Sequence, residues 1–250
     1  MRLDPLTSRT QTADDPVHRA LLGVVRQAAA SGEALPNEYD LAERIGCSRQ
    51  QVRNALSALE AAGILRRRQG APTTVDPLGL QMSVRLEDQF EHTELLARLG
   101  HRASVELLEN EPARLPARIA ALLGVPESAP ALRTLKRWSA DDRPVMLAEG
   151  YLLLPDAADA HRDMPSSVFA AVSALWGEPI IWDVTTPGAA SLDAETAALL
   201  RMDPGAATLT LELVGVAASG RRLFYAFEHH DPAVVRYSLV RTVRPPWGLI

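Results

Sequence analysis

The apolar and polar positions of residues 35–73 predict two helices, a tight turn and a short hairpin. The first predicted helix lies between a capping residue, Asn37, and a terminating glycine, Gly46. The second helix begins after Ser48, which has the spacing of a capping box with Gln51. Its apolar face consists of Val52, Ala55, Leu56 and Leu59. After Gly63 the pattern predicts two short strands joined by a turn.

The outer face of the second predicted helix is polar. Gln50, Asn54 and Ser57 lie opposite the apolar face, and Arg49 and Arg53 lie along one flank. Two helices around a tight turn, followed by a basic hairpin, are the plan of a winged helix-turn-helix. In that fold the second helix enters the major groove and its N-terminal residues contact bases. The sequence therefore predicts a DNA-binding unit.

The remaining pattern predicts one more helix before this unit and an α+β domain after it. Residues 16–31 form a helical pattern between Pro16 and Gly32. Residues 77–82 contain Pro77 and Gly79 and are predicted to be a linker. Beyond it we expect helices at 86–99, 116–123, 166–176 and 193–201, and strands at 103–111, 131–140, 145–154, 180–185, 208–217, 222–228 and 234–243. Clustered hairpins with peripheral helices favour a mainly antiparallel sheet.

Composition is ordinary for a globular protein, with 250 residues, 47% hydrophobic and 23% charged. No apolar run approaches the roughly 20 residues of a membrane span. Residues 1–14 lack the apolar segment of a secretory signal, and we expect a disordered arm there. The single cysteine, Cys47, excludes a disulfide within one chain and fits a reducing, cytoplasmic location.

Positive charge is concentrated in the predicted DNA-binding unit. The whole chain has a net charge of −5, yet residues 44–75 contain six arginines and one acidic residue, a local charge of +5. Phosphate contacts require such a basic surface. Double-stranded DNA is therefore the expected partner.

The spacing of particular residues in 35–63 resembles the N-terminal signature of GntR-type bacterial transcription regulators. The match includes Leu35, Pro36, Glu38, Leu41, Ala42, Gly46, Ser48, Arg49, Val52, Arg53, Ala55, Leu56, Leu59 and Gly63. The wing departs from the family pattern, because Gly70-Ala71-Pro72-Thr73 lacks the second glycine of G-x-G-T. The resemblance implies a winged helix-turn-helix at 15–76.

Residues 83–250 resemble the effector-binding domain of the HutC subfamily, called UTRA. The similar segments are Leu99-Gly100, 122–125, 137–145, 151–155 and 167–169. The resemblance implies a chorismate-lyase-like fold, a small-molecule effector and a homodimer. The expected protein is a ligand-controlled regulator, most simply a repressor.

The candidate DNA-binding residues come from the reading helix and from the resemblance. Arg49 and Arg53 have the one-turn spacing from which guanidinium groups bond guanine, and Ser48 and Gln51 suit phosphates or base edges. Tyr39, Gln69 and Gly70 match further positions at which relatives touch DNA.

The candidate effector-binding residues follow from the resemblance alone: Arg137, Glu149, Ser167, Tyr225 and Glu228. Arg137 and Glu149 are each one residue out of step with the family spacing, and such a shift turns a strand side chain to the other face unless a bulge compensates. Phe169 and Phe224 replace a tyrosine and an acid of relatives that bind sugar phosphates. We therefore expect an anionic effector with a large apolar or aromatic part, its acid group held by Arg137.

Other functional classes are less well supported. His229, His230 and Asp231 suggest a metal site, but adjacent strand residues point to opposite faces. No nucleotide-binding or hydrolase motif is present in the sequence, and we expect neither a cofactor nor an enzyme. Two alternatives stay open: a DNA-bound protein whose C-terminal domain only dimerises, and an enzyme with a regulatory DNA-binding head.

Overall fold

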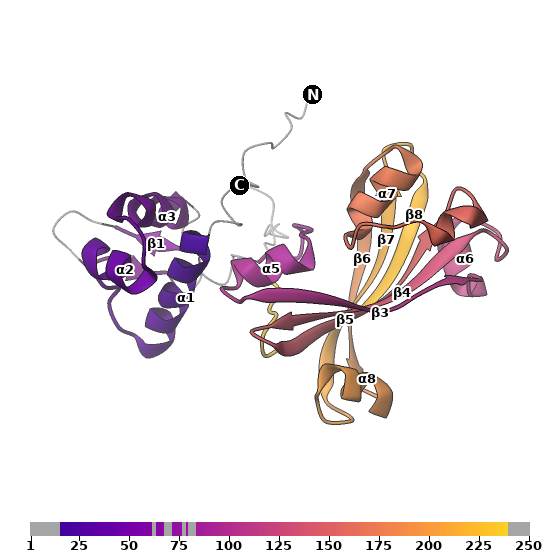
Figure 1. Ribbon diagram of the computed structural model, residues 1–250. Coiled ribbons are helices and arrows are strands. Elements are labelled where there is room, and N and C mark those ends of the chain that lie inside the picture. The colour runs from indigo at the N-terminus through magenta and orange to yellow at the C-terminus, as the bar shows by residue number, and fades with distance from the viewer. Residues whose placement is uncertain (1–15, 62–63, 68–71, 77–78, 80–83, 240–250) are drawn as a thin grey trace, which may run out of the picture. The chain divides into compact units, whose positions relative to one another are not determined.

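The computed structural model describes residues 16–61, 64–67, 72–76, 79 and 84–239. The chain divides into two compact units, Met1–Arg102 with Arg236–Ile250, and Ala103–Val235 (Figure 1). The sequence predicted a UTRA-like region from residue 83 to residue 250. The predicted division and the division of the structure therefore differ in where they assign residues 83–102 and 236–250. The predicted arm at 1–14 lies outside the described residues.

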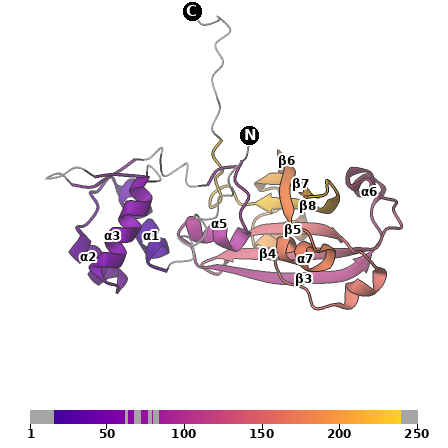
Figure 2. The same cartoon turned by 90° about the horizontal axis from the view of Figure 1, so that it is seen from above.

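The first unit is built around three helices, which lie together in Figure 2. Its elements are α1 (Pro16–Ser31), α2 (Glu38–Ile45), α3 (Arg49–Ala61), β1 (Leu65–Arg66), β2 (Thr74–Val75) and α5 (His92–Arg98). Asn37 caps α2 by accepting hydrogen bonds from the backbone N–H groups of Tyr39 and Asp40, at 2.9 and 3.0 Å. Gly46 ends α2 with φ of 74°, in the left-handed region that glycine adopts readily.

The core of this unit confirms the predicted apolar faces. Fifteen buried side chains from α1, α2, α3 and the hairpin form one cluster, which includes Leu21, Leu41, Val52, Leu56 and Leu59. β1 and β2 pair antiparallel, as predicted for the wing. A winged helix-turn-helix therefore forms as the sequence indicates.

Two predictions for this unit are wrong. The helix expected at 86–99 forms only as α5, and the strand expected at 234–243 is absent from its described part, residues 234–239. The backbone groups of these two segments bond each other instead. Leu86 N–H donates to the Ser238 carbonyl, and Ser238 N–H donates to the Val84 carbonyl, both at 2.9 Å. Residues 240–243 lie outside the described part.

The second unit is a six-stranded antiparallel sheet with the order β3-β4-β5-β8-β7-β6. Its elements are β3 (Ala103–Ala113), α6 (Ala117–Leu123), β4 (Ala131–Ala140), β5 (Arg143–Leu153), η1 (Ala157–His161), α7 (Val168–Trp176), β6 (Ile180–Ser191), α8 (Ala194–Leu200), β7 (Ala207–Ala217) and β8 (Arg222–His230). Asp141 and Asp142 join β4 to β5 and both have positive φ, 51° and 70°. Two consecutive residues with positive φ form the kind of two-residue turn that suits the right-handed twist of a hairpin. The predicted α+β class is confirmed, although β6 continues six residues past its predicted end at 185.

Helices cover both faces of this sheet, with α8 on one side and α7 on the other (Figure 1). Leu147 belongs to the cluster beneath α8, and Tyr151 and Leu153 belong to the cluster beneath α6. Because strand side chains alternate between faces, these odd-numbered β5 residues define one surface, the α8 face. The even-numbered residues Ala148 and Gly150 lie on the other surface, the α7 face.

A close approach fixes the packing of the α7 face. The ring of Phe224 on β8 lies against Gly215 of the neighbouring strand β7, where a β-carbon would overlap it. Phe169 of α7 meets the same ring edge-on, with centroids 5.8 Å apart. Only glycine at 215 leaves room for this arrangement.

Among the described helices, none is both long and apolar enough to cross a membrane.

Candidate DNA-binding surface and effector face

Helix α3, the predicted reading helix, exposes the polar face that the sequence predicted. Arg49, Gln50, Arg53 and Asn54 are all exposed, while the opposite face is buried in the core. Ser48 and Gln51 form the predicted capping box: Gln51 N–H donates to Ser48 Oγ at 3.3 Å, and Ser48 N–H donates to Gln51 Oε1 at 3.0 Å. The box fixes the start of α3, which is the end that meets bases in this fold.

Glu38 of α2 holds arginines from two other parts of the unit. Its carboxylate accepts a hydrogen bond from Arg53 of α3 at 3.0 Å and another from Arg67, just after β1, at 3.1 Å. The hydrogen bond from Arg53 lowers the pKa of Glu38 below its usual value, so Glu38 is charged at neutral pH. One carboxylate therefore orders two guanidinium groups and leaves an excess of positive charge. The sequence placed Glu38 in the family signature but gave no signal for this contact.

The remaining DNA candidates are placed as follows. Tyr39 is 64% exposed at the start of α2. Gln69 and Gly70 lie outside the described residues. A contact that was not predicted joins α1 to α2, because Arg44 donates to the side chain of Gln27 at 2.8 Å.

The five effector candidates do not lie together. Three of them, Arg137, Glu149 and Tyr225, are on the α8 face. Arg137 donates to the carbonyl of Leu199 in α8 at 3.0 Å and to Glu106 at 2.6 Å. Glu149 accepts from Arg133 at 2.6 Å, and Tyr225 donates to Glu212 at 2.8 Å. The side chains of these three candidates are therefore engaged in local pairs.

Ser167 and Glu228 are on the opposite, α7 face. Ser167 caps α7, with Oγ accepting from the N–H of Ala170 at 3.2 Å. Glu228 is 5% exposed, and its carboxylate bonds His230 at 2.9 Å. His229 points the other way and bonds Thr208 at 2.9 Å, so the adjacent histidines diverge as their alternation requires.

Lys136, the residue before Arg137, lies on the opposite face of β4. Lys136 lies on the α7 face and donates to the carbonyl of Ser166, next to the start of α7, at 2.6 Å. The β4–β5 pairing is irregular between Trp138 and Ser139. The anion-holding role of Arg137 stays a prediction; Arg137 lies on the α8 face and Lys136 on the α7 face.

Small residues occupy the middle of the α7 face. Register pairs Lys136 with Ala148 and Ala148 with Glu228, while Gly150 pairs with Ala226 in the next row. Cross-strand neighbours lie about 5 Å apart, which separates the β-carbons of Lys136 and Glu228 by roughly 10 Å. A cationic side chain and a carboxylate thus lie on either side of Ala148, beside the small residues Gly150 and Ala226.

Asp183 of β6 adds a second carboxylate to this face, since it pairs with Gly215 in the register. Burial raises the pKa of Asp183, a hydrogen bond from Thr185 lowers it, and the nearby charge of Glu228 raises it further; the net shift is upward. The α7 face therefore has a cationic part near Lys136 and an acidic part near Asp183 and Glu228.

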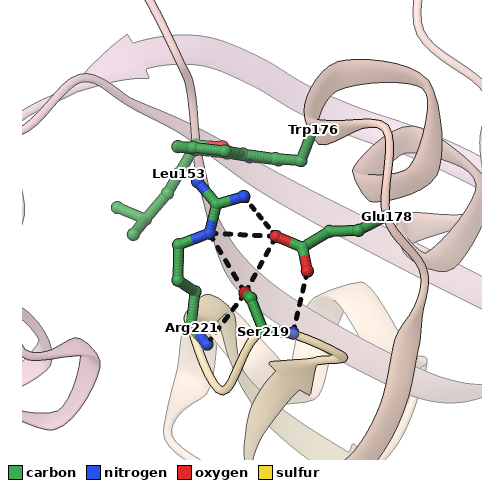
Figure 3. A network of polar contacts seen from close by, with 5 residues as sticks. All are labelled: Leu153, Trp176, Glu178, Ser219 and Arg221. Carbon is green, nitrogen blue, oxygen red and sulfur yellow. Dashed lines mark hydrogen bonds and ion pairs between the residues drawn. The ribbon is translucent and has the colours of Figure 1, made fainter.

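A polar network fastens the C-terminal end of α7, as Figure 3 shows. Glu178 accepts hydrogen bonds from the N–H and the hydroxyl of Ser219, each at 3.0 Å, and from Arg221 at 2.9 Å. The guanidinium of Arg221 lies over the ring of Trp176, 4.6 Å from its centroid, and Trp176 donates to the carbonyl of Leu153 at 2.9 Å. The turn between β7 and β8 is thereby tied to α7, which holds the helix in place over the sheet. No pattern in the sequence indicated this network.

Two family descriptions match the chain. Residues 98–235 match the UTRA domain, and residues 23–75 match the bacterial regulatory proteins of the gntR family. The chain is 28% identical to the HTH-type transcriptional regulator Rv0792c of Mycobacterium tuberculosis over 227 residues, which are 86% of this chain and 80% of that protein. It is 27% identical to the uncharacterized HTH-type transcriptional regulator RB1450 of Rhizobium meliloti over 215 residues, 83% of this chain and 88% of the relative.

A solved structure shares the fold. PhnF from Mycobacterium smegmatis superposes with a TM-score of 0.57 and 23% identity, covering 88% of this chain and 100% of that one. At this level of identity the likeness concerns the fold alone.

Proposed function

The chain belongs to the family of bacterial GntR transcriptional regulators that carry a UTRA domain, and from this premise we propose that it is a repressor whose affinity for operator DNA is set by a small molecule bound on the α7 face. Residues 15–76 are the DNA-binding part in this proposal, 77–82 the linker, and 83–250 the effector-binding and dimerisation part. Binding would shift the population between two arrangements of paired DNA-binding units.

The observation that carries the DNA-binding proposal is the Glu38 contact. The Glu38 carboxylate lies 3.0 Å from the guanidinium group of Arg53 and 3.1 Å from that of Arg67, and it holds both groups beside the exposed face of α3. Arg53 then contacts base edges and Arg67 a phosphate, which are the sequence-reading and the positioning parts of such a surface.

The proposed effector is an anion with an apolar body. Lys136 and the backbone N–H groups at the start of α7 favour a negative group. The edge-to-face rings of Phe169 and Phe224 and the small residues beside them favour an apolar part. Arg137 has no role in this revised site, because it bonds Leu199 and Glu106 on the other face.

The proposed homodimer uses the β6 edge of the sheet. Both β3 and β6 are edge strands with an irregular register, but β3 carries Glu106, Glu109 and Glu111, and charged side chains on an edge discourage strand pairing. In β6, by contrast, Ile181, Trp182 and Val184 are 57%, 52% and 55% exposed. An exposed apolar surface on an edge strand favours pairing with another chain.

Charge and symmetry select a second copy as that partner. Residues 180–186 hold a single charged side chain, Asp183, which is bonded to Thr185 on its own strand. Two β3 edges would bring like charges together, and β3 against β6 would build open chains. Two β6 edges related by a two-fold axis form a closed dimer. Pro187 limits the paired segment to the first part of β6.

The testing experiment is selection of sequences from randomised duplex DNA with the full chain, followed by binding to the selected site with pools of organic anions. We expect enrichment of a palindrome and release by some pool. Enrichment without release by any pool would favour a protein whose C-terminal domain only dimerises. Failure to enrich any sequence would contradict the proposed sequence-specific binding to DNA.

A further inference from the structure

Two amide side chains on the exposed face of α3 are bonded to each other. Gln50 is the second residue of α3, and Asn54 follows it by one turn. Gln50 Nε2 donates to Asn54 Oδ1 at 2.9 Å, and both residues are exposed. Their position on the helix is the one from which side chains reach base edges in the major groove.

The bond between the amides determines what the pair still offers to DNA. Each amide has one carbonyl oxygen and two N–H groups. With the bond formed, the Gln50 oxygen stays available as an acceptor and the Asn54 nitrogen as a donor. If the bond ran in the opposite sense, the pair would again present one free oxygen and free N–H groups. One acceptor beside one donor is therefore a property of the pair.

Each base presents a different set of groups to such a pair. Adenine offers the N7 acceptor and the N6 donor in the major groove, whereas guanine offers two acceptors, N7 and O6. An acceptor and a donor side by side match adenine and place an oxygen against an oxygen on guanine. Arginine forks, which have donors only, match guanine.

We infer that Gln50 and Asn54 together read one adenine in each half of the operator, next to the bases contacted by Arg49 and Arg53. The inference rests on the proposed DNA-binding function and adds the identity of a base. Gln50 accepts a hydrogen bond from adenine N6, and Asn54 donates to N7. The mutual bond orders both side chains before DNA arrives, which reduces the entropy lost on binding.

The test is selection from randomised duplex DNA with the full chain, performed in parallel for wild type, Asn54→Ala, Asn54→Asp and Ser57→Ala. Wild type should fix an A·T pair in each half-site. Asn54→Ala should reduce the preference for that pair by roughly 5- to 150-fold, the range of a two-bond base contact, and leave the other fixed positions in place.

Asn54→Asp changes the chemistry without changing the shape. With the bond from Gln50 kept, the pair presents the Gln50 oxygen and a carboxylate oxygen at position 54, two acceptors, beside the second N–H of Gln50, and the fixed adenine should give way to cytosine, whose N4 group is a donor. Ser57→Ala lies one turn further along the same exposed face and should select the wild-type motif. Melting temperatures of the four proteins establish that each is folded.

The outcomes separate this inference from the function on which it rests. If Asn54→Ala and wild type select the same motif, or if the variant only weakens all sequences equally, the adenine contact does not exist. If wild type fixes guanine at the position that responds to Asn54, the donor–acceptor argument is wrong, although DNA binding stands. If wild type enriches no sequence, the proposed function itself fails and this inference with it.

Discussion

Glu38→Gln tests whether one carboxylate restrains the two arginines that we propose contact DNA. In the protein, Glu38 accepts hydrogen bonds from Arg53 and Arg67 at 3.0 and 3.1 Å. The substitution keeps the size of the side chain and removes its charge. We expect Arg67 to become available to an additional phosphate, and Arg53 to lose the partner that orients its donors toward bases.

The magnitude follows from counterion release. Each neutralised phosphate steepens the plot of log affinity against log salt by about 0.9. One additional phosphate contact therefore makes the affinity of Glu38→Gln fall about 3.5-fold more than that of wild type between roughly 50 and 200 mM salt. Non-specific DNA should bind more tightly at low salt, while the ratio of specific to non-specific affinity should decrease.

The assay is fluorescence anisotropy with operator and scrambled duplexes at several salt concentrations. Glu43→Gln is the matched control, because Glu43 is an exposed residue of the same helix and the substitution makes the same change in net charge. Because the hydrogen bond from Arg53 lowers the pKa of Glu38, the carboxylate stays charged at neutral pH, and the difference should be constant between about pH 6 and 8. An unchanged slope for Glu38→Gln, or the same change in Glu43→Gln, would refute the reasoning.

Three further predictions follow from the contacts. Arg53→Ala should relax the base preference at one position of the selected site, whereas Arg67→Ala should weaken the binding of all DNA sequences alike and reduce the dependence of affinity on salt. Fluorescence anisotropy with variant duplexes measures both effects, and identical motifs and affinities for Arg53→Ala and wild type would contradict the prediction. Lys136→Met should abolish release of the operator by the anion pool that releases wild type, and Arg137→Met should retain it; the reverse pattern would assign the site to the α8 face. Trp182→Lys should shift the full chain from dimer to monomer in sedimentation at micromolar concentration, and a dimer of unchanged stability would place the interface elsewhere.

Local patterns accounted for most elements of both units. The helix at 16–31, the cap at Asn37, the capping box at Ser48 and Gln51, and the hairpin of β4 and β5 depend on residues close together in sequence. Their hydrogen bonds and backbone angles are set within a few residues, so a sequence pattern is enough to predict them. The predictions for the segments around 86 and 238 were wrong because Val84 and Leu86 exchange backbone hydrogen bonds with Ser238, which is far away in the sequence.

Site residues divide in the same way. The polar face of α3 follows from helical period alone, and the sequence determined it completely. The pairing of Glu38 with Arg53 and Arg67 was decided by the tertiary structure, because it joins a helix to two elements that packing brings near. The α7 face shows the limit most clearly: Lys136 and Arg137 are adjacent cations in the sequence, and the helices that pack on either side of the sheet decide which of them faces α7. A strand pattern gives alternation between two faces, but only the tertiary packing identifies each face, because that depends on helices distant in the chain.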